Sequence, residues 1–325
     1  MSPSAAGASV AIRVNGELLP DNGDLPSAAI VPIYSITKTL TAICALKLAE
    51  SRLLRLEDPI GAIVTDVDLP RAITLTHLLR HTSGLRDYGG QRQYHEAVRS
   101  HPSHPWTREQ FVDAVVPKGL LFEPGTGWSY SNVGYMLIVD AIERATGHPF
   151  ATVLDHIVAA PLGLRNTFTL EQPSDMQLCV AGFGTDVTID GSMRDVRDVY
   201  HPGWCAPRLV ASTAAETTRI YDALFTGELL ESRMLDRMLA LVPMPGTSGA
   251  PPSIGAGMGV YSDAASKHGL NYHHGGGGPG YSTSVTIYPE TPQGRVAIAV
   301  FLDSSEVPEA RETEMEWLEK VLGWR

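Results

Sequence analysis

The 325-residue sequence predicts an α/β (α+β) fold, in which strands from both ends of the chain form one antiparallel sheet flanked by helices. Two observations predict it. Runs near the two ends alternate apolar and polar side chains, as half-buried strands do, whereas the middle has helical periods separated by Gly- and Pro-rich loops. We therefore expect a sheet domain made of residues 1–66 and 205–325, a mostly helical domain of residues 67–204, and an active site between them.

The first expected element is a β-hairpin at residues 9–19. It alternates in polarity and contains Asn15-Gly16, a dipeptide that suits a type I′ turn because both central residues take positive φ. Residues 35–54 then combine strong helix formers with apolar side chains nearly all round, which is typical of a buried helix. Ser35 would lie at or just before the first turn of this helix.

The remaining elements follow from their periodicity. Helical spacing recurs at residues 107–116, 131–147, 150–164 and 212–227. Short alternating runs bounded by turn residues then appear at residues 257–263, 268–274, 281–289 and 295–303. The last three of these runs predict an antiparallel meander, and residues 307–324 predict an amphipathic helix packed on the resulting sheet.

Composition excludes several classes of function. No apolar run approaches the roughly 18 residues of a membrane span, so we expect no membrane partner. The first 16 residues lack the basic start and apolar core of a secretory signal, which predicts a cytoplasmic protein. A net charge of -11 without any Lys/Arg cluster argues against nucleic acid as a partner.

We also expect no cofactor and no metal. The three cysteines, Cys44, Cys179 and Cys205, are odd in number and widely separated, as reduced and mostly buried thiols are. His101 and His104 have no further ligands nearby in the sequence, which favours solvated loop residues over a metal site.

Ser35 and Lys38 form an S-x-x-K pattern that has two interpretations. Serine is a favoured helix N-cap, which would leave Lys38 as an ordinary surface residue. Alternatively, Ser35 is a nucleophile at a helix N-terminus, where free N–H groups favour developing negative charge, and Lys38 at i+3 is its proton partner. A lysine acts as a base near neutral pH only if burial or other cations lower its pKa, and the apolar residues around Lys38 predict burial.

Two later segments supply matching chemistry. Tyr130-Ser131-Asn132 reads either as a loop entering a helix, with Ser131 or Asn132 as the cap, or as a general base with a substrate-binding amide. The glycine run after His274 matches G-x-G-x-x-G, but a strand follows it, which excludes a dinucleotide cradle. Glycines at a strand edge otherwise indicate that something approaches the backbone closely, and a substrate carbonyl is one such group.

Ser35-x-x-Lys38, Tyr130-x-Asn132 and His274-x-Gly276, in this order, resemble the motifs of the serine penicillin-recognising family. That family comprises serine β-lactamases of the AmpC-like class C type, DD-peptidases, and related esterases, D-aminopeptidases and transacylases. The resemblance runs from about residue 31 to residue 302, through the segments 73–85, 122–147, 160–167, 209–230 and 274–284. It implies the β-lactamase-like fold.

The resemblance also implies residue roles. Ser35 would be the nucleophile, Lys38 its proton partner, and Tyr130 the general base for acylation and the acid for the leaving group. Asn132 would position the substrate and Lys38. The backbone N–H groups of Ser35 and Gly277 would form the oxyanion hole, and His274 and Gly276 would line the site opposite the nucleophile.

The third motif leaves points open. The histidine of the motif could also be His273, which adjoins His274, or His201, which begins another His-x-Gly. We prefer His274, because its spacing to Pro279 matches the family form. A histidine stands where β-lactamases and DD-peptidases carry a lysine, which argues against β-lactam hydrolysis. A helix that usually covers the sheet beside the C-terminal helix is missing from the short N-terminal part, and the apolar face so left suggests a homodimer as a hypothesis.

These features predict a serine acyl-enzyme hydrolase that acts on an ester or amide of a small molecule. One alternative is a transacylase that passes the acyl group from Ser35 to an amine or alcohol, as in natural-product pathways such as those of nucleoside antibiotics. A second is a ligand-binding sensor that acylates once without turnover. The loop 85–106 is expected to form part of the pocket, with Tyr88, Tyr94 and Trp106 as its walls.

Overall fold

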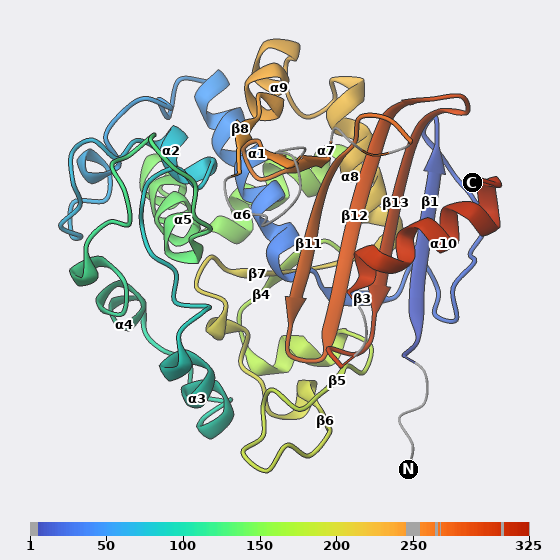
Figure 1. The fold of residues 1–325 in the computed structure, drawn as a ribbon, viewed down its shortest axis with the longest axis horizontal. Coiled ribbons are helices and arrows are strands. Elements are labelled where there is room, and N and C mark those ends of the chain that lie inside the picture. The colour runs from blue at the N-terminus through green and yellow to red at the C-terminus, as the bar shows by residue number, and fades with distance from the viewer. Residues whose placement is uncertain (1–5, 245–253, 264–265, 267, 307–308, 325) are drawn as a thin grey trace.

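The computed structural model describes residues 6–244, 254–263, 266, 268–306 and 309–324 and contains one large antiparallel sheet (Figure 1). Its eight strands run in the order β2-β1-β13-β12-β11-β10-β9-β8. Their bounds are β1 Ala8–Val14, β2 Glu17–Leu18, β8 Val242–Pro243, β9 Ile254–Ala256, β10 Tyr261–Asp263, β11 Tyr272–Gly278, β12 Tyr281–Thr291 and β13 Gly294–Leu302. The first and last thirds of the chain therefore share one sheet, and the predicted α/β class with an antiparallel sheet is confirmed.

The hairpin at the N-terminus forms as predicted. Strands β1 and β2 pair antiparallel, with Val14 opposite Glu17. Asn15 and Gly16 between them have φ of 50° and 89°, the left-handed values that a type I′ turn requires. β1 then pairs along its whole length with β13, from Ala8 opposite Leu302 to Val14 opposite Val296.

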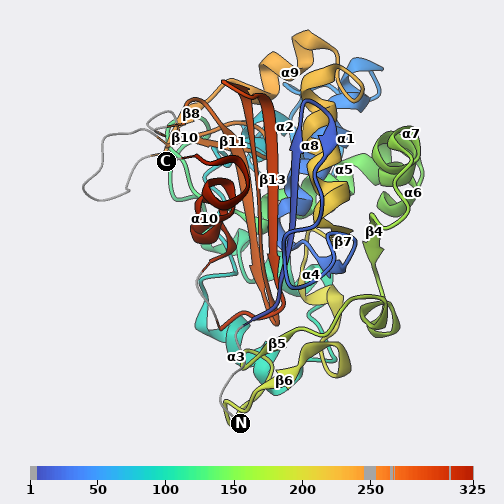
Figure 2. The same cartoon turned by 90° about the vertical axis from the view of Figure 1, so that its right-hand side faces the viewer.

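Helices cover both faces of the sheet (Figure 2). α8 (Ala214–Thr226) packs on β1 and β13 from one side, and α10 (Ala310–Leu322) packs on β12 and β13 from the other. Residues 307 and 308, where the predicted last helix starts, lie outside the described part, as do residues 1–5 of the segment searched for an export signal.

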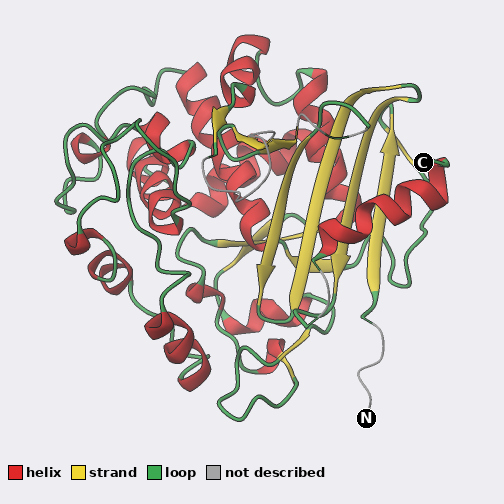
Figure 3. Ribbon diagram, in the orientation of Figure 1, coloured by secondary structure: helices red, strands yellow, loops and turns green. Residues whose placement is uncertain are grey.

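The apolar face beside α10 is closed within the chain, contrary to the expectation of a missing cover. Val10 and Ile12 of β1 are 1% exposed and belong to a core cluster with Leu318 and Trp324 from the C-terminal segment. α10 lies across the strands in Figure 3, so its apolar side chains and the chain end cover this face. The uncovered face that suggested a homodimer is therefore absent from the described residues.

The helical part stands beside the sheet, and α1 runs through the middle of the molecule (Figure 1). α1 is buried on all sides, as its sequence predicts, with every residue from Ile36 to Leu46 in the interior. The helices are α1 Thr37–Glu50, α2 Leu75–Leu79, α3 Arg92–Ser100, α4 Arg108–Asp113, α5 Asn132–Thr146, α6 Phe150–Leu154, α7 Ala160–Leu162 and α9 Ser232–Leu239. α3 lies inside the segment 85–106 that was expected to be a loop, because Tyr94, Ala97 and Val98 pack at helical spacing against the main core.

A second sheet of three short strands, which the sequence did not predict, supports the start of α1. It has the order β3-β7-β4, with bounds Ile30–Pro32, Leu209–Thr213 and Phe168–Leu170. Ile33 N–H donates to the Val210 carbonyl at 2.8 Å, and Val210 N–H donates to Thr37 Oγ1 at 3.2 Å. These bonds fix the backbone immediately before and after Ser35. A small two-stranded sheet, β5 Phe183–Gly184 with β6 Arg194–Asp195, lies below the three-stranded sheet in the view of Figure 1.

None of the helices in the described ranges combines the length and the apolar content needed to cross a membrane.

Candidate active site

Ser35 lies in a single 3-10 turn, Tyr34–Ile36, that leads directly into α1. Neither this turn nor α1 has a side-chain N-cap, so Ser35 does not perform the capping role that its position allowed. Tyr34 just before it has φ of 43°, a left-handed conformation that a residue with a Cβ adopts only when its surroundings enforce it. Tyr34 is buried and its hydroxyl donates to the Pro279 carbonyl at 2.6 Å, which holds this turn against β11.

Lys38 and Tyr130 both reach the Ser35 hydroxyl. Lys38 Nζ donates to Ser35 Oγ at 3.2 Å, and Tyr130 OH donates to the same oxygen at 2.8 Å. Lys38 Nζ also lies over the Tyr130 ring, 4.9 Å from its centroid, and 5.7 Å from that of Tyr135. The structure thus brings together three residues that are up to 95 positions apart in the sequence.

Burial changes the ionisation of both partners of Ser35. Desolvation lowers the pKa of Lys38 to about 8, and attraction to Asp87 offsets only part of that shift. Desolvation raises the pKa of Tyr130, and its hydrogen bond with Ser35 opposes this shift. At pH 7 about a tenth of Lys38 is therefore the neutral amine, able to accept a proton, while Tyr130 is a phenol, able to donate one.

His81 positions the segment that carries Tyr130. Its ring lies 4.5 Å, centroid to centroid, from that of Tyr130, and its Nδ1 accepts a hydrogen bond from Ser131 N–H at 3.1 Å. Desolvation and then repulsion from Lys38 lower the pKa of His81 well below its usual range, so the imidazole is neutral. Ser131 is the N-cap of α5, because its Oγ accepts from Gly134 N–H at 3.1 Å.

Asn132 is held by Asp87 rather than by Lys38. Asn132 Nδ2 donates to Asp87 Oδ2 at 3.1 Å, and its backbone N–H donates to Asp87 Oδ1 at 2.9 Å. Desolvation raises the pKa of the Asp87 carboxyl despite the hydrogen bonds from Asn132. Because both Nδ2 and N–H point to one carboxylate, the side-chain oxygen of Asn132 is oriented away from Asp87.

The two adjacent histidines of β11 face opposite sides of the sheet. His274 pairs with Val285 of the main core and is 2% exposed, whereas His273 pairs with Thr286, whose hydroxyl donates to Glu314 of α10. Burial and the nearby Lys38 lower the pKa of His274 to about 3. His274 Nδ1 lies 2.7 Å from the Gly275 carbonyl, so the neutral ring donates there, and its Nε2 has no partner among the described residues.

The glycines of β11 serve two different purposes. A Cβ on Gly276 would collide with the Ile33 carbonyl oxygen, and one on Gly278 would collide with the Tyr34 ring. These two glycines therefore admit the protein's own Ser35 turn, not a substrate. A Cβ on Gly277 would meet no atom within 4 Å, so its backbone borders open space next to Ser35.

Two hollows meet at Ser35, and of the three predicted pocket walls, Tyr88 and Tyr94 line one of them. A cleft of about 240 Å³ is lined by Ser35, Lys38, Tyr88, Tyr94, Asn132 and Gly277, among others. A hollow of about 440 Å³ on the sheet side is lined by Ser35, Tyr130, His274, Gly276, Gly277 and Arg311, among others. Trp106 lines neither: it packs edge-on against Tyr94, with ring centroids 5.6 Å apart, and borders a third cavity.

Other polar residues considered from the sequence lie away from Ser35. His101 and His104 are exposed, and His201 accepts from Gly203 N–H at the start of a 3-10 turn. The part of the chain that the structure describes holds no cluster of three or more residues suited to a metal ion. His81 and Asp87 were missed, because each acts on a residue far away in the chain and no spacing pattern indicates such a contact.

Comparisons with known proteins agree with this geometry. Residues 2–321 match the family model described as Beta-lactamase. Penicillin-binding protein 4* of Bacillus subtilis (strain 168) is 28% identical over 276 residues, which are 81% of this chain and 59% of the relative. D-alanyl-D-alanine-carboxypeptidase/endopeptidase AmpH of Escherichia coli (strain K12) is 31% identical over 169 residues, 50% of this chain and 42% of the relative. The chain thus spans about half the length of these curated relatives.

The fold has a counterpart in the crystal structure of a D-stereospecific amidohydrolase from Streptomyces sp. The two superpose with a TM-score of 0.84 at 24% identity, over 99% of this chain and 95% of the other. The match of the family model extends over nearly the whole chain, and the serine, lysine and tyrosine of the motifs meet in space. This chain belongs to the β-lactamase family.

Proposed function

We propose that this protein is a serine acyl-enzyme hydrolase that acts on an ester or amide of a small molecule. One observation carries the proposal: Ser35 Oγ lies within hydrogen-bond distance of both Lys38 Nζ and Tyr130 OH. A nucleophile with a proton acceptor and a proton donor on the same oxygen is what covalent acyl transfer requires. The relatives named as a carboxypeptidase/endopeptidase and an amidohydrolase support hydrolysis as the reaction type.

In the acylation step the neutral fraction of Lys38 takes the Ser35 proton as Oγ attacks the carbonyl carbon. The backbone N–H groups of Ser35 and Gly277, which border the same cleft, stabilise the oxyanion that forms. The intermediate collapses by breaking the bond to the leaving group. Tyr130 protonates that group, and Lys38 returns the serine proton to Tyr130, so the protons balance. Water then releases the acyl group by the reverse route.

This assignment differs in one respect from the roles implied by the sequence resemblance, in which Tyr130 was the base. The lowered pKa of Lys38 and the raised pKa of Tyr130 favour the lysine as base and the tyrosine as acid. Asn132, oriented by Asp87, would bind the substrate through its side-chain oxygen. His274 lines the sheet-side hollow and its buried Nε2 has no partner among the described residues, so it would accept a hydrogen bond from the leaving-group side.

Three further statements belong to the same proposal. The site would lie between a sheet domain of residues 1–66 and 205–325 and a helical domain of residues 67–204. The protein would act in the cytoplasm on a diffusible substrate. A homodimer has lost the support of an uncovered sheet face, so we propose that the site works within one chain.

The decisive experiment supplies an activated ester with and without a panel of amines and follows both acyl-enzyme mass and products. Free acid regardless of amine is expected for a hydrolase. Amide at high yield would instead indicate a transacylase, and a single burst without turnover a sensor. Ser35→Ala should abolish the acyl-enzyme adduct and lower kcat/KM by at least about 10³-fold; full turnover by this variant would refute the mechanism.

A further inference from the structure

The two hollows at Ser35 can be assigned to the two halves of a substrate, an assignment that rests on the proposed function. Tyr130 lines the hollow on the sheet side but not the 240 Å³ cleft. A leaving group protonated by Tyr130 must lie in the hollow that Tyr130 borders. The acyl group then occupies the cleft on the other side of Ser35, between Tyr88, Tyr94 and Asn132.

The acyl cleft shares a wall with a larger cavity. That cavity measures about 500 Å³. Its walls combine the apolar side chains of Trp106, Phe111, Met136, Leu170 and Leu209 with the charged side chains of Arg108, Asp140, Glu143 and Glu171. The residues that line both spaces are Cys205 and Arg208. At roughly 30 Å³ per water molecule, the cleft alone has room for about eight waters, and so for a compact acyl group.

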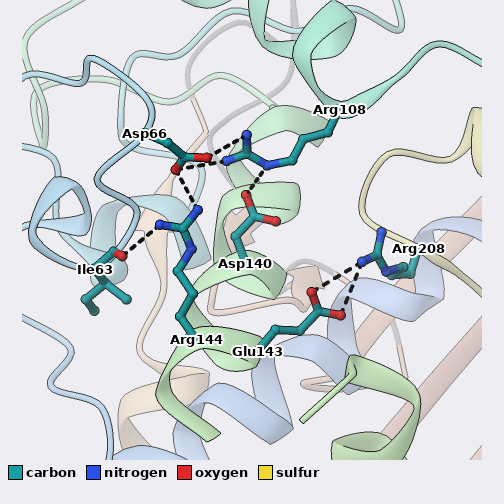
Figure 4. Close-up of polar contacts among 7 residues, drawn as sticks. All are labelled: Ile63, Asp66, Arg108, Asp140, Glu143, Arg144 and Arg208. Atoms are coloured by element: carbon teal, nitrogen blue, oxygen red, sulfur yellow. Dashed lines mark hydrogen bonds and ion pairs between the residues drawn. The ribbon is translucent and has the colours of Figure 1, made fainter. Parts of the chain in front are cut away.

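Arg208 is held in this wall by an unusual backbone and by an ion pair. Its φ is 72°, in the left-handed region that favours glycine, so an arginine here is strained and must be enforced by its surroundings. Its Nη2 donates to both carboxylate oxygens of Glu143 on α5, at 3.2 and 3.3 Å (Figure 4). Glu143 also accepts from Phe150 N–H at 2.9 Å, which keeps the carboxylate in place.

The helix that carries Glu143 is itself anchored. Asp140 of α5 pairs with Arg108 at 2.8 Å, and Arg144 of α5 pairs with Asp66, which also contacts Arg108 (Figure 4). This network ties α5 to α4 and to the segment around residue 66, and two of its members, Arg108 and Asp140, line the 500 Å³ cavity. The ion pair at Arg208 therefore connects the wall to a fixed part of the molecule.

We propose that Arg208 is a specificity-determining residue: with its Glu143 ion pair, it closes the acyl cleft and limits the enzyme to short acyl groups. The cavity behind it, whose walls combine large apolar side chains with charged ones, is the space that a longer acyl chain would enter if the arginine side chain were absent. Arg208 forms its side-chain hydrogen bonds with Glu143 and takes no part in the Ser35–Tyr130 contact that moves protons, so the reaction itself requires nothing else of it.

The test compares p-nitrophenyl acetate, butyrate and octanoate, which share one leaving group, in the wild type and in Arg208→Gly. Glycine accepts the left-handed backbone, so the variant should fold. We expect the wild type to prefer the short esters. In Arg208→Gly the octanoate-to-butyrate ratio of kcat/KM should rise at least tenfold, because each further methylene that becomes buried contributes roughly fourfold. Arg208→Asn, which also tolerates this φ, and Glu143→Gln, which keeps an acceptor for Phe150 N–H, should raise the ratio less.

Arg52→Gly is the matched control, because Arg52, like Arg208, is an exposed arginine with positive φ, 63°, but lines neither hollow at Ser35. Its ratio should equal that of the wild type. An unchanged ratio in both Arg208 variants, or an equal rise in Arg52→Gly, would overturn the inference. If Ser35→Ala kept the turnover of the wild type, the proposed function itself would be refuted. Failure of the inference about Arg208 can therefore be distinguished from failure of the proposed function.

Discussion

Two ionisable side chains are equally buried on opposite sides of the large sheet, and they differ in what surrounds them. Lys38 and Glu314 are each 3% exposed. Glu314 on α10 accepts from Ser284 Oγ at 2.6 Å and Thr286 Oγ1 at 2.7 Å and pairs with Arg311 at 3.4 Å. Lys38 contacts a hydroxyl and two aromatic rings, and it forms no ion pair with any described carboxylate.

The difference separates a structural buried charge from a reactive one. Desolvation moves both groups toward their neutral forms, raising the pKa of Glu314 and lowering that of Lys38. Around Glu314, hydrogen bonds and an arginine oppose that shift, which ties α10 to β12. Around Lys38 the weak compensation leaves an amine that titrates close to neutral pH. Uncompensated burial is thus the property that would suit Lys38 to the proposed role of base.

The largest effect should come from removing the reactive charge. Lys38→Met is expected to lower kcat/KM by about 10²- to 10⁴-fold, since the general base is lost. The same change should raise the free energy of unfolding by up to about 3 kcal/mol below pH 8, because it removes a buried ammonium whose pKa falls from 10.5 to about 8 on folding. Ester hydrolysis and urea unfolding of the same preparations measure both.

The sign of the stability effect follows from the direction of the shift. Below pH 8 the folded wild type must hold a charged, desolvated Lys38, and this penalty disappears as pH rises toward 10.5, where the unfolded chain is also neutral. The stability gain of Lys38→Met should therefore shrink between pH 8 and 10.5. A variant that is less stable than the wild type at pH 7 would contradict the idea that Lys38 is uncompensated.

The next largest effect concerns the structural charge. Glu314→Ala should lower the free energy of unfolding by about 3 kcal/mol, because two buried hydroxyls and Arg311 lose their acceptor. Urea denaturation measures this loss. Glu316→Ala is the matched control: it lies on the same helix, is exposed, and should change stability by no more than about 0.5 kcal/mol. Equal effects of the two changes would show that the buried contacts of Glu314 are not stabilising.

The smallest expected effect is a shift in pH dependence. For a non-ionisable ester, kcat/KM should rise with pH through an apparent pKa of about 8, because the neutral amine of Lys38 is the active form. Asp87→Asn should move this inflection to lower pH, since the Asp87 charge is the largest interaction that raises the pKa of Lys38. Stopped-flow or plate assays from pH 6 to 10 test both; a flat profile across pH 8 would exclude Lys38 as the base.

Much of the fold was predictable because its elements are encoded locally. Period-two alternation predicted the strands that form β1, β12 and β13, and Asn15-Gly16 predicted the hairpin turn. The run predicted at residues 268–274 covers only the start of β11, which continues through the glycines to Gly278. The three-stranded sheet under Ser35 was missed, because β3 and β4 are only three residues long and such runs carry no periodic signal. Helix α3 was missed within a segment whose glycines, prolines and histidines resemble a loop.

The sequence by itself determined the family and predicted which residues carry the chemistry: Ser35, Lys38, Tyr130 and His274 lie in recognisable motifs whose order marks the family. Only the tertiary structure decided how they are used. Burial, which depends on every neighbouring segment, moves the pKa of Lys38 toward that of a base and keeps Tyr130 a phenol. Three further features arise where distant segments contact one another: the face of the sheet that each β11 side chain occupies, the hydrogen bond of Asn132 with Asp87, and the wall at Arg208. Local spacing carries no information about such long-range contacts.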